Sequence, residues 1–485
     1  MKNISIWQEM KSKELKSVNS NLECDTLVIG GGMSGLSILY QLKKANIKTI
    51  LVERNRCGQG VSARSSAKIT YLQGSIYQNI RRFGNIKLAK QYLNSQIAAI
   101  AELKRIVKKE HIDCDFAVAT SYLFTDYEKN KDKLQQEYEF LKSAGAKVQF
   151  LENTELFKYA IASDDTYMFN PVKYMLGLKD ILKDSIYENS KVKKIVKLKS
   201  HYEVAVNGFV IKAKHVVIAT HYPYFLLPML LPFKSHVETS FVGAARVDEY
   251  KNINAINIDK EIISFRYYKT GENNYFIYLL GSTPSCNIKS IKENFAYFKE
   301  NKNFVYEWSN KDIITNDYLP IIGKIDDEDD GALIACGYNT WGMSNSTIAG
   351  VIIKDIICKK ENEYIESFRP NRLLNLNKVV RFIPDMIGNV KAFVKSNKNN
   401  CNNKKVCYTK YEGKRVAIYK DEKGLEHMVL NRCPHLKCGL VFNEVEKTWD
   451  CLCHGSRFDI DGKCIEGPSN YDISIKRKSD SDAQE

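Results

Sequence analysis

Four cysteines and two histidines are concentrated in one short stretch near the end of the chain, CPHLKCGLVFNEVEKTWDCLCHGSRF, residues 433–458. The whole chain of 485 residues contains only 13 Cys and 8 His. Thiolate and imidazole groups are the usual ligands of zinc and of some iron–sulfur clusters, and cysteines also pair in disulfides. A structural zinc site, a disulfide framework and a redox cluster are therefore the three chemistries to compare.

The spacing of these residues favours a cluster. The first two cysteines, Cys433 and Cys438, are too far apart for a short zinc knuckle, and the next two are too close together. A disulfide framework is disfavoured in a reducing compartment. What remains is C-x-H followed by C-x-x-H, the Rieske pattern, in which two thiolates bind one iron of a [2Fe–2S] cluster and two imidazoles bind the other. The predicted ligands are Cys433, His435, Cys451 and His454.

Length and composition predict a multidomain globular protein. A chain of 485 residues is too long for one ordinary core, and 44% of its residues are hydrophobic. No apolar run is long enough for a membrane span, and the N-terminal stretch has none typical of a signal peptide, so we expect a cytoplasmic location. The net charge of +15 comes from scattered lysines without an aromatic-interleaved basic block, so we do not expect nucleic-acid binding.

A second chemical motif lies near the N-terminus, in CDTLVIGGGMSGLSILYQLKKANIKTILVERN, residues 24–55. The pattern predicts a buried strand at 27–29, an amphipathic helix at 34–44 and a second strand at 48–52. Three glycines form G-x-G-x-x-G between the first strand and the helix: Gly30, Gly32 and Gly35. This context is typical of a dinucleotide-binding fold.

Each residue of this motif has a physical task. Gly30 permits a tight turn, Gly32 lets a pyrophosphate approach the backbone, and Gly35 allows the helix to pack closely on the strand. The helix N-terminus attracts phosphate. Glu53, at the end of the second strand, can accept hydrogen bonds from ribose hydroxyls, which predicts FAD or NAD in preference to NADP.

Two later segments favour FAD. A further strand, KHVVIATHYP, occupies residues 214–223, and a strand, glycine turn and helix follow in ALIACGYNTWGMSNSTIAGVIIKDII, residues 332–357. This spread resembles the flavoproteins of the D-amino-acid oxidase and glycine oxidase superfamily. The resemblance implies that Gly342 and Met343 open a helix whose N-terminus points at the flavin, where its positive end would stabilise the reduced, anionic ring.

The same resemblance implies further FAD contacts. The segment GVSARSSAKITYLQGSIY, residues 60–77, lies where that superfamily wraps a loop along the pyrophosphate and the ring, so the candidate residues are Ser62, Ser65, Ser66 and Lys68. Val192 lies where the superfamily contacts adenine through the backbone. A polar surface loop is the alternative for residues 60–77.

The middle of the chain, about 85–310, mixes helical and strand patterns and resembles the interleaved substrate domain of this superfamily. An amino-acid substrate would call for a carboxylate-binding set, and the nearest candidates are Arg266, Tyr267 and Tyr268. An arginine in a strand can equally form a structural ion pair, so the catalytic residues stay open.

The C-terminal residues 397–480 resemble a Rieske domain, with β-hairpins from Val406 onward. The resemblance to respiratory Rieske proteins implies that Cys438 and Cys453 form a disulfide joining the two ligand loops. It also implies that Ser456 hydrogen-bonds a bridging sulfide. Phe458 departs from the family, which has a tyrosine there, so we expect a lower reduction potential than in the respiratory proteins.

Together these features resemble bacterial FAD-dependent oxidoreductases with a C-terminal Rieske domain. The expected fold is an α/β, Rossmann-like FAD domain with an interleaved α+β substrate domain, followed by a small all-β Rieske domain. The expected boundaries are an N-terminal arm at 1–21, the oxidoreductase domain at 22–370, a linker at 371–396, the Rieske domain at 397–480 and a tail at 481–485. An amphipathic piece in the linker could pack on a domain or touch a membrane surface.

The implied activity is oxidation of an amine or amino acid, with electrons passing from FAD to the cluster and on to an external acceptor. Two alternatives remain open. In one, an external donor feeds the cluster and the flavin reduces a substrate. In the other, the protein is an electron carrier or redox sensor without turnover.

Overall fold

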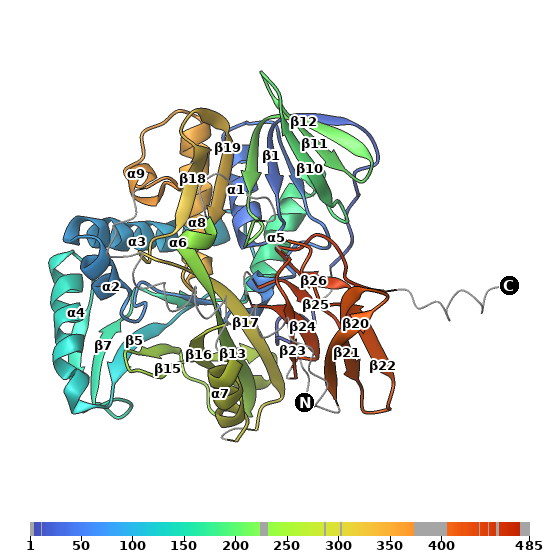
Figure 1. The fold of residues 1–485 in the computed structure, drawn as a ribbon. Coiled ribbons are helices and arrows are strands. Elements are labelled where there is room, and N and C mark those ends of the chain that lie inside the picture. Colours follow the sequence, from blue (N-terminus) through green and yellow to red (C-terminus); the bar gives the residue numbers. More distant parts are fainter. Residues whose placement is uncertain are drawn as a thin grey trace.

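The computed structural model describes residues 4–10, 12–223, 231–285, 288–300, 303–372, 405–435, 437–444, 446–452 and 455–475. Two large sheets with covering helices form the main body, and the strands of residues 406–466 lie beside it, next to β17 (Figure 1). The expected linker lies almost entirely outside the described residues, and so do the tail, Cys453 and His454.

The first sheet belongs to a dinucleotide-binding fold. Its strands follow the order β10-β11-β12-β1-β2-β9, and β19 joins β12 and pairs with β18. β1 lies parallel to β2 and β12, and β12 lies parallel to β19. Their bounds are β1 Leu22–Ile29, β2 Thr49–Val52, β9 Ile186–Tyr187, β10 Val192–Lys197, β11 Tyr202–Val206, β12 Phe209–Ile218, β18 Ile321–Asp326 and β19 Asp329–Cys336. Ligands bind such sheets at the carboxyl ends of the parallel strands.

The helices of this domain pack on both the sheet and one another. Helix α1 packs mainly against α8 and also against α5, and α8 packs against α3. The bounds are α1 Met33–Lys44, α2 Ile76–Phe83, α3 Ile86–Lys109, α5 Pro171–Leu182, α8 Gly342–Ile357 and α9 Ile365–Phe368. The predicted helix at 34–44 is thus confirmed and begins one residue earlier.

The second sheet is the interleaved domain. Its eight strands follow the order β17-β13-β16-β15-β14-β5-β7-β6 and are antiparallel except where β14 meets β5. The bounds are β5 Thr120–Thr125, β6 Gln149–Glu152, β7 Tyr159–Ser163, β13 Ser235–Val247, β14 Ile253–Asn257, β15 Ile262–Thr270, β16 Asn273–Pro284 and β17 Tyr306–Thr315. Helices α4 Lys131–Ser143, α6 Leu231–Lys234 and α7 Ile288–Glu300 accompany this sheet. The last strand extends beyond the expected limit of about 310.

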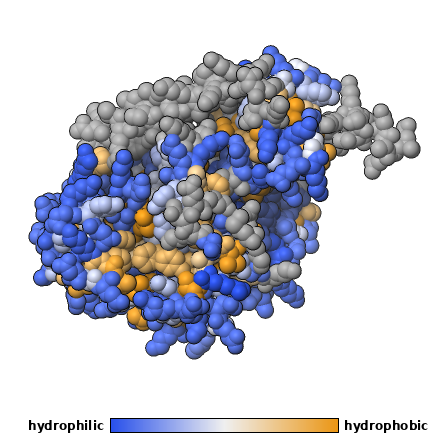
Figure 2. Space-filling view, turned by 90° about the horizontal axis from the view of Figure 1, so that it is seen from below, coloured by the Kyte–Doolittle hydropathy of each residue, from blue (hydrophilic) through white to orange (hydrophobic). Residues whose placement is uncertain are grey.

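A small three-stranded sheet contains β3 Lys68–Ile69, β4 Ala117–Val118 and β8 Tyr167–Met168. One large core cluster runs through both domains, since it includes residues of α1, α3, α5, α8 and of the second sheet. Viewed from below, hydrophobic residues gather over part of the surface among hydrophilic ones (Figure 2). None of the helices in the described ranges is long and apolar enough to span a membrane.

The C-terminal domain is all β, as predicted. A three-stranded sheet holds β20 Val406–Tyr411, β21 Lys414–Lys420 and β22 Glu426–Leu430. A four-stranded sheet holds β23 Leu440–Asn443, β24 Thr448–Cys451, β25 Arg457–Phe458 and β26 Cys464–Glu466. The core of this domain includes Cys433, Cys451, Trp449 and Phe458.

The N-terminal segment, expected to be an arm, packs into the body of the protein. Trp7 is 0% exposed and its Nε1 donates a hydrogen bond to the carbonyl of Ser65 at 2.7 Å. Burying a tryptophan with its N–H satisfied is a strong anchor, so this segment is held against the oxidoreductase domain.

Candidate functional site

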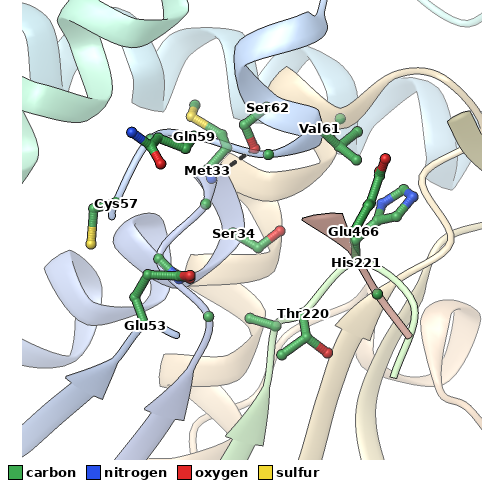
Figure 3. A pocket seen from close by; sticks show the side chains of 18 of the residues that line it. Met33, Ser34, Glu53, Cys57, Gln59, Val61, Ser62, Thr220, His221 and Glu466 are labelled. Atoms are coloured by element: carbon green, nitrogen blue, oxygen red, sulfur yellow. Dashed lines mark hydrogen bonds between the residues drawn. The ribbon is translucent and has the colours of Figure 1, made fainter. Parts of the chain in front are cut away.

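A cavity of about 680 Å³ opens where the parallel strands β1, β2, β12 and β19 end. Its walls come from the glycine turn after β1, the segment after β2, the loop after β12 and the start of α8. Figure 3 shows Met33 and Ser34 in the middle of this wall, with Glu53 to one side and His221 to the other. This is the position at which such sheets bind dinucleotides.

The glycine turn has the geometry that the motif predicts. Gly30 has a φ of +112°, and a Cβ there would lie 2.5 Å from the carbonyl oxygen of Ala219. A Cβ on Gly35 would lie 1.8 Å from the carbonyl oxygen of Gly30, so α1 packs directly against the turn. A side chain at Gly35 would push α1 away from the turn, and one at Gly30 would clash with the backbone that follows β12.

The start of α1 is suited to an anion. The first turn of α1 contains no acidic residue, and its N-cap, Gly32, makes no side-chain capping bond. The hydroxyl of Ser62 accepts a hydrogen bond from the backbone N–H of Met33 at 3.1 Å, which ties the 60–65 segment to this turn (Figure 3). Free N–H groups and the helix dipole favour phosphate here.

Glu53 holds the turn as well as facing the cavity. One carboxylate oxygen accepts a hydrogen bond from Gly31 N–H at 2.7 Å, and the other accepts one from Asn55 N–H at 2.9 Å. A carboxylate has further lone pairs that a ribose hydroxyl can use.

The second helix that points at the cavity is α8. Gly342 and Met343 line the cavity, and the first turn of α8 again lacks acidic residues. Ser34 joins the two helix starts, since its hydroxyl lies 2.9 Å from both Tyr338 Oη and Ser346 Oγ. Two helix N-termini on one cavity give it a positive potential that fits an anionic dinucleotide.

Most of the predicted FAD contacts meet at this cavity. The lining includes Gly30, Gly32, Glu53, Ser62, Ser65, Val192, Gly342 and Met343. Gly35 acts behind the lining, through helix packing. Ser66 and Lys68 lie outside it: the carbonyl of Ser66 accepts a hydrogen bond from Arg266, and Lys68 is buried in β3. Burial and the nearby Arg266 lower the pKa of Lys68 to about 7.

The substrate-domain candidates also lie apart from the cavity lining. The guanidinium of Arg266 donates to three buried carbonyls, those of Ser66, Ala67 and Phe169, at 3.2, 2.6 and 3.0 Å. The Tyr268 hydroxyl donates to Asp115 at 2.9 Å and accepts from Asn170 at 3.0 Å. These bonds fix the backbone around β3 and α5, which is a structural role.

The described part of the cluster site contains three of the four predicted ligands. Cys433 and Cys451 are both 1% exposed and belong to one buried core, and His435 follows in the first loop. The neighbouring Cys451 thiol and burial raise the pKa of Cys433 well above its ordinary value. The two thiols therefore lie side by side, as the two thiolate ligands of one iron must, whereas no group of three metal-ligating side chains comes together within the described ranges.

The two sites are joined through the loop after β12. Tyr222 lines the cavity, is 4% exposed, and its ring centroid lies 6.3 Å from that of His435. Residues 465–468 and Asn470, which follow or end β26, also line the cavity. The C-terminal domain is therefore part of the cavity wall.

The sequence patterns missed several residues of this region. Thr220 and His221 could have been found, because they lie near the carboxyl end of the strand predicted at 214–223. Glu466 and Asn470 could not, because only the docking of two domains brings them to the cavity. The partners of Arg54 could not be predicted either, because they lie in the C-terminal domain.

The chain matches two families. Residues 25–356 match the family described as FAD dependent oxidoreductase, and residues 392–475 match the Rieske [2Fe-2S] domain. A protein of Bacillus subtilis described as a Rieske 2Fe-2S iron-sulfur protein, YhfW, is 28% identical, with 93% of each chain covered. The γ-glutamylputrescine oxidoreductase of Escherichia coli is 21% identical over 70% of this chain and 85% of its own length.

Among solved structures, glycine oxidase from Geobacillus kaustophilus shares the fold. It has a TM-score of 0.57 and 17% sequence identity, and covers 73% of this chain and 100% of its own. The glycine turn, the two helix starts and the paired cysteine loops agree with these matches. The chain belongs to the FAD dependent oxidoreductase family, binds FAD, and carries a Rieske [2Fe-2S] domain with its cluster at the C-terminal end.

Proposed function

We propose that this enzyme oxidises a small amine or amino acid and passes the electrons, within the same chain, to the Rieske cluster and then to an external acceptor. The observation that carries this proposal is the packed contact between Tyr222, in the wall of the FAD cavity, and His435, a predicted cluster ligand. It supports the proposal because electron transfer between two cofactors needs a short, packed route.

Buried charge pairs hold the two domains in this arrangement. Lys311 Nζ lies 2.8 Å from Asp450 Oδ2, and these side chains are 4% and 8% exposed. Arg457, paired with Glu446 inside the Rieske domain, donates across the domain boundary to Ser309 Oγ at 3.1 Å. Separating buried partners leaves uncompensated charges, so we expect one docked arrangement rather than a freely moving Rieske domain.

Bound FAD would supply a two-electron acceptor for a hydride from the carbon that bears the amine, and the cluster a one-electron carrier. The chain itself contributes binding and electrostatics. The start of α1 and Ser62 would hold the pyrophosphate, and Glu53 the ribose. The start of α8, at Gly342, would stabilise negative charge in the cavity.

The substrate class rests on relatives. One is named for γ-glutamylputrescine and a structural neighbour for glycine, both of which carry an amino group. A carboxylate-binding role for Arg266 finds no support in its contacts, because its guanidinium is occupied by buried carbonyls. The proposed substrate therefore carries an amino group, with or without a carboxylate.

For the cluster, we propose Cys433, His435, Cys451 and His454 as ligands and a disulfide between Cys438 and Cys453. His454 and Cys453 lie outside the described residues. Reduced protein should give an EPR signal with the low average g-value of mixed ligation, and His435→Cys or His454→Ala should abolish it. One zinc per chain without acid-labile sulfide would refute the ligand set, and free thiols at both remaining cysteines would refute the disulfide.

The direct test of the reaction is an anaerobic spectral titration of the purified holoenzyme with a panel of amines and amino acids. The proposal predicts that at least one compound bleaches the flavin and is recovered as the corresponding imine or its hydrolysis product. Flavin that stays oxidised with every amine, yet is reduced by an external electron donor through the cluster, would favour the reverse direction of flow.

A further inference from the structure

We infer that the Rieske domain closes the FAD cavity, and that its residues 464–470, the closing loop, govern how long FAD is retained. The closing loop follows from the position of its residues. Ile465, Glu466 and Asn470 line the same cavity as the glycine turn and Glu53. Family membership explains the cavity but not this wall, which comes from the other domain.

The closing loop is tied to the flavin side by Arg54, the residue after Glu53. One guanidinium nitrogen donates to the carbonyl of Ile465 at 2.9 Å, and the other to that of Ser469 at 3.4 Å. Hydrogen bonds from a charged donor are stronger than neutral ones. The residue beside the predicted ribose ligand is thus held by the Rieske domain.

A second tie lies at the predicted adenine contact. The side-chain amide of Asn470 donates to the carbonyl of Val192 at 3.2 Å. The next residue back, Ser469, is fully buried, and its N–H donates to Ser456 Oγ at 2.9 Å. Ser456 in turn hydrogen-bonds the Cys433 side chain. A continuous set of contacts therefore runs from the wall of the FAD cavity to a predicted cluster ligand.

Glu466 brings a charge into the cavity. Figure 3 shows it beside His221, on the side away from Glu53. Burial alone would raise the pKa of Glu466, but Arg64, Arg457 and His221 together hold it below its ordinary value. A partly buried carboxylate between Arg64 of the FAD domain and Arg457 of the Rieske domain resists separation, because moving the loop would leave these charges unpaired.

Release of FAD would then require the closing loop to leave the cavity. A ligand that binds only the closed arrangement also stabilises that arrangement, and the coupling is reciprocal. FAD should therefore slow the motion of the loop, and cutting the ties of the loop should speed the loss of FAD. Closure of the FAD cavity by the closing loop does not depend on whether the cluster accepts electrons. The inference can therefore be tested without enzyme turnover.

The experiment measures the rate of FAD release from full-length holoenzyme by the rise in free-flavin fluorescence after dilution. Arg54→Ala removes charge-assisted hydrogen bonds to the loop, and we expect FAD release about tenfold faster. Asn470→Ala removes one neutral hydrogen bond, and we expect release about fivefold faster. The control is Lys292→Ala, which cuts an exposed pair with Glu444 that also joins the two domains but lies away from the cavity lining. Its release rate should equal that of wild type, and the cluster EPR signal should persist in all three variants.

A second measurement does not depend on how the variants fold. In wild-type protein depleted of FAD and then reconstituted, hydrogen exchange of the amides at 464–470 should be slower with FAD than without. Loop variants that release FAD at the wild-type rate, or exchange in the closing loop that FAD leaves unchanged, would overturn the inference. Equal acceleration in Lys292→Ala would also overturn it, because docking in general would then be responsible.

Discussion

At the scale of single residues, the chemistry depends on a few side chains whose partners are now defined. Glu53 accepts hydrogen bonds from two backbone N–H groups, that of Gly31 in the glycine turn and that of Asn55 in the segment after β2. Its role is therefore double, because it shapes the turn and offers acceptors to a ribose. Tyr222 and His435 connect the two sites through ring packing.

The variant Glu53→Ala should weaken FAD binding by about tenfold or more, since it removes an acceptor for the ribose and leaves the N–H of Gly31 unsatisfied. The dissociation constant can be measured by titrating FAD-depleted protein and following flavin fluorescence. The dissociation constant of Glu53→Gln, which keeps one acceptor oxygen, should lie between those of wild type and Glu53→Ala. Wild-type affinity in the alanine variant, or purification with stoichiometric NAD and no flavin, would contradict this role.

The side chain at position 458 is expected to influence the reduction potential of the cluster. It is fully buried in the same core as Cys433 and Cys451. In Phe458→Tyr, a hydroxyl that reaches a cysteine sulfur would stabilise the reduced cluster and raise its reduction potential by about 40 mV, the equivalent of roughly 1 kcal/mol for one electron. Protein-film voltammetry can measure this shift. An unchanged or lower potential would show that the hydroxyl does not reach sulfur.

At the scale of elements, much of the site followed from sequence because its parts are local. The strand, glycine turn and helix around Gly30 are adjacent in the chain, so their spacing located them. The turn and helix at Gly342 are adjacent too, but the resemblance to the D-amino-acid oxidase superfamily was needed to assign them to the flavin. Strand β17 is the opposite case. Its residues 309–312 face both the cavity and the Rieske domain, a position that only tertiary docking creates.

Arg266 shows a further limit of sequence reasoning. An arginine near tyrosines in a strand fits a carboxylate site, yet this side chain is turned to backbone carbonyls inside the protein. Residue type alone cannot distinguish a ligand-binding arginine from one that satisfies buried carbonyls, because both need the same five donors.

The variant Lys311→Ala should loosen the docking of the Rieske domain. It leaves Asp450 partly uncompensated in a buried site, which typically costs about 3 kcal/mol, whereas an exposed pair contributes about 0–1 kcal/mol. Backbone amides of β17 and β24 should exchange hydrogen faster than in wild type, and Lys292→Ala should leave them unchanged. Equal exchange in all three proteins would mean that the buried pair does not hold the domains together.

The carboxyl of Asp312, also on β17, predicts a pH dependence. Burial, and next the charge of Glu238, raise its pKa from 3.8 to about 7. The folded state therefore favours the protonated form. The preference of the folded protein for protonated Asp312 stabilises the fold fully at pH values below the pKa of this carboxyl in the unfolded chain. That stabilisation is lost as the pH rises from about 4 to about 7.

Asp312→Asn, which stays neutral, should not lose that stability. The melting temperature of the variant relative to wild type should therefore increase between about pH 4 and pH 7 and level off above. The same substitution at the exposed Asp327 serves as the control. A difference between Asp312→Asn and wild type that is constant with pH would show that Asp312 ionises freely in the folded protein.

At the scale of the whole molecule, two cofactor sites share one wall. The FAD domain and the Rieske domain are each recognisable from their own motifs, so the architecture could be predicted from the sequence. Their mutual position could not, because the contacts that set it are single residues spread over distant segments, such as Tyr222 with His435 and Arg54 with the closing loop. The proposed electron-transfer route from FAD to the cluster depends on this mutual position of the two domains.

In the proposed route, electrons from a substrate pass from FAD to the cluster inside one chain. The most direct test mixes the anaerobic holoenzyme with a reducing amine and follows the cluster by freeze-quench EPR at several protein concentrations. If transfer is intramolecular, the EPR signal of the reduced cluster should follow flavin bleaching at a rate independent of protein concentration. A cluster that stays oxidised while the flavin is fully reduced, or one reduced at a rate proportional to protein concentration, would contradict it.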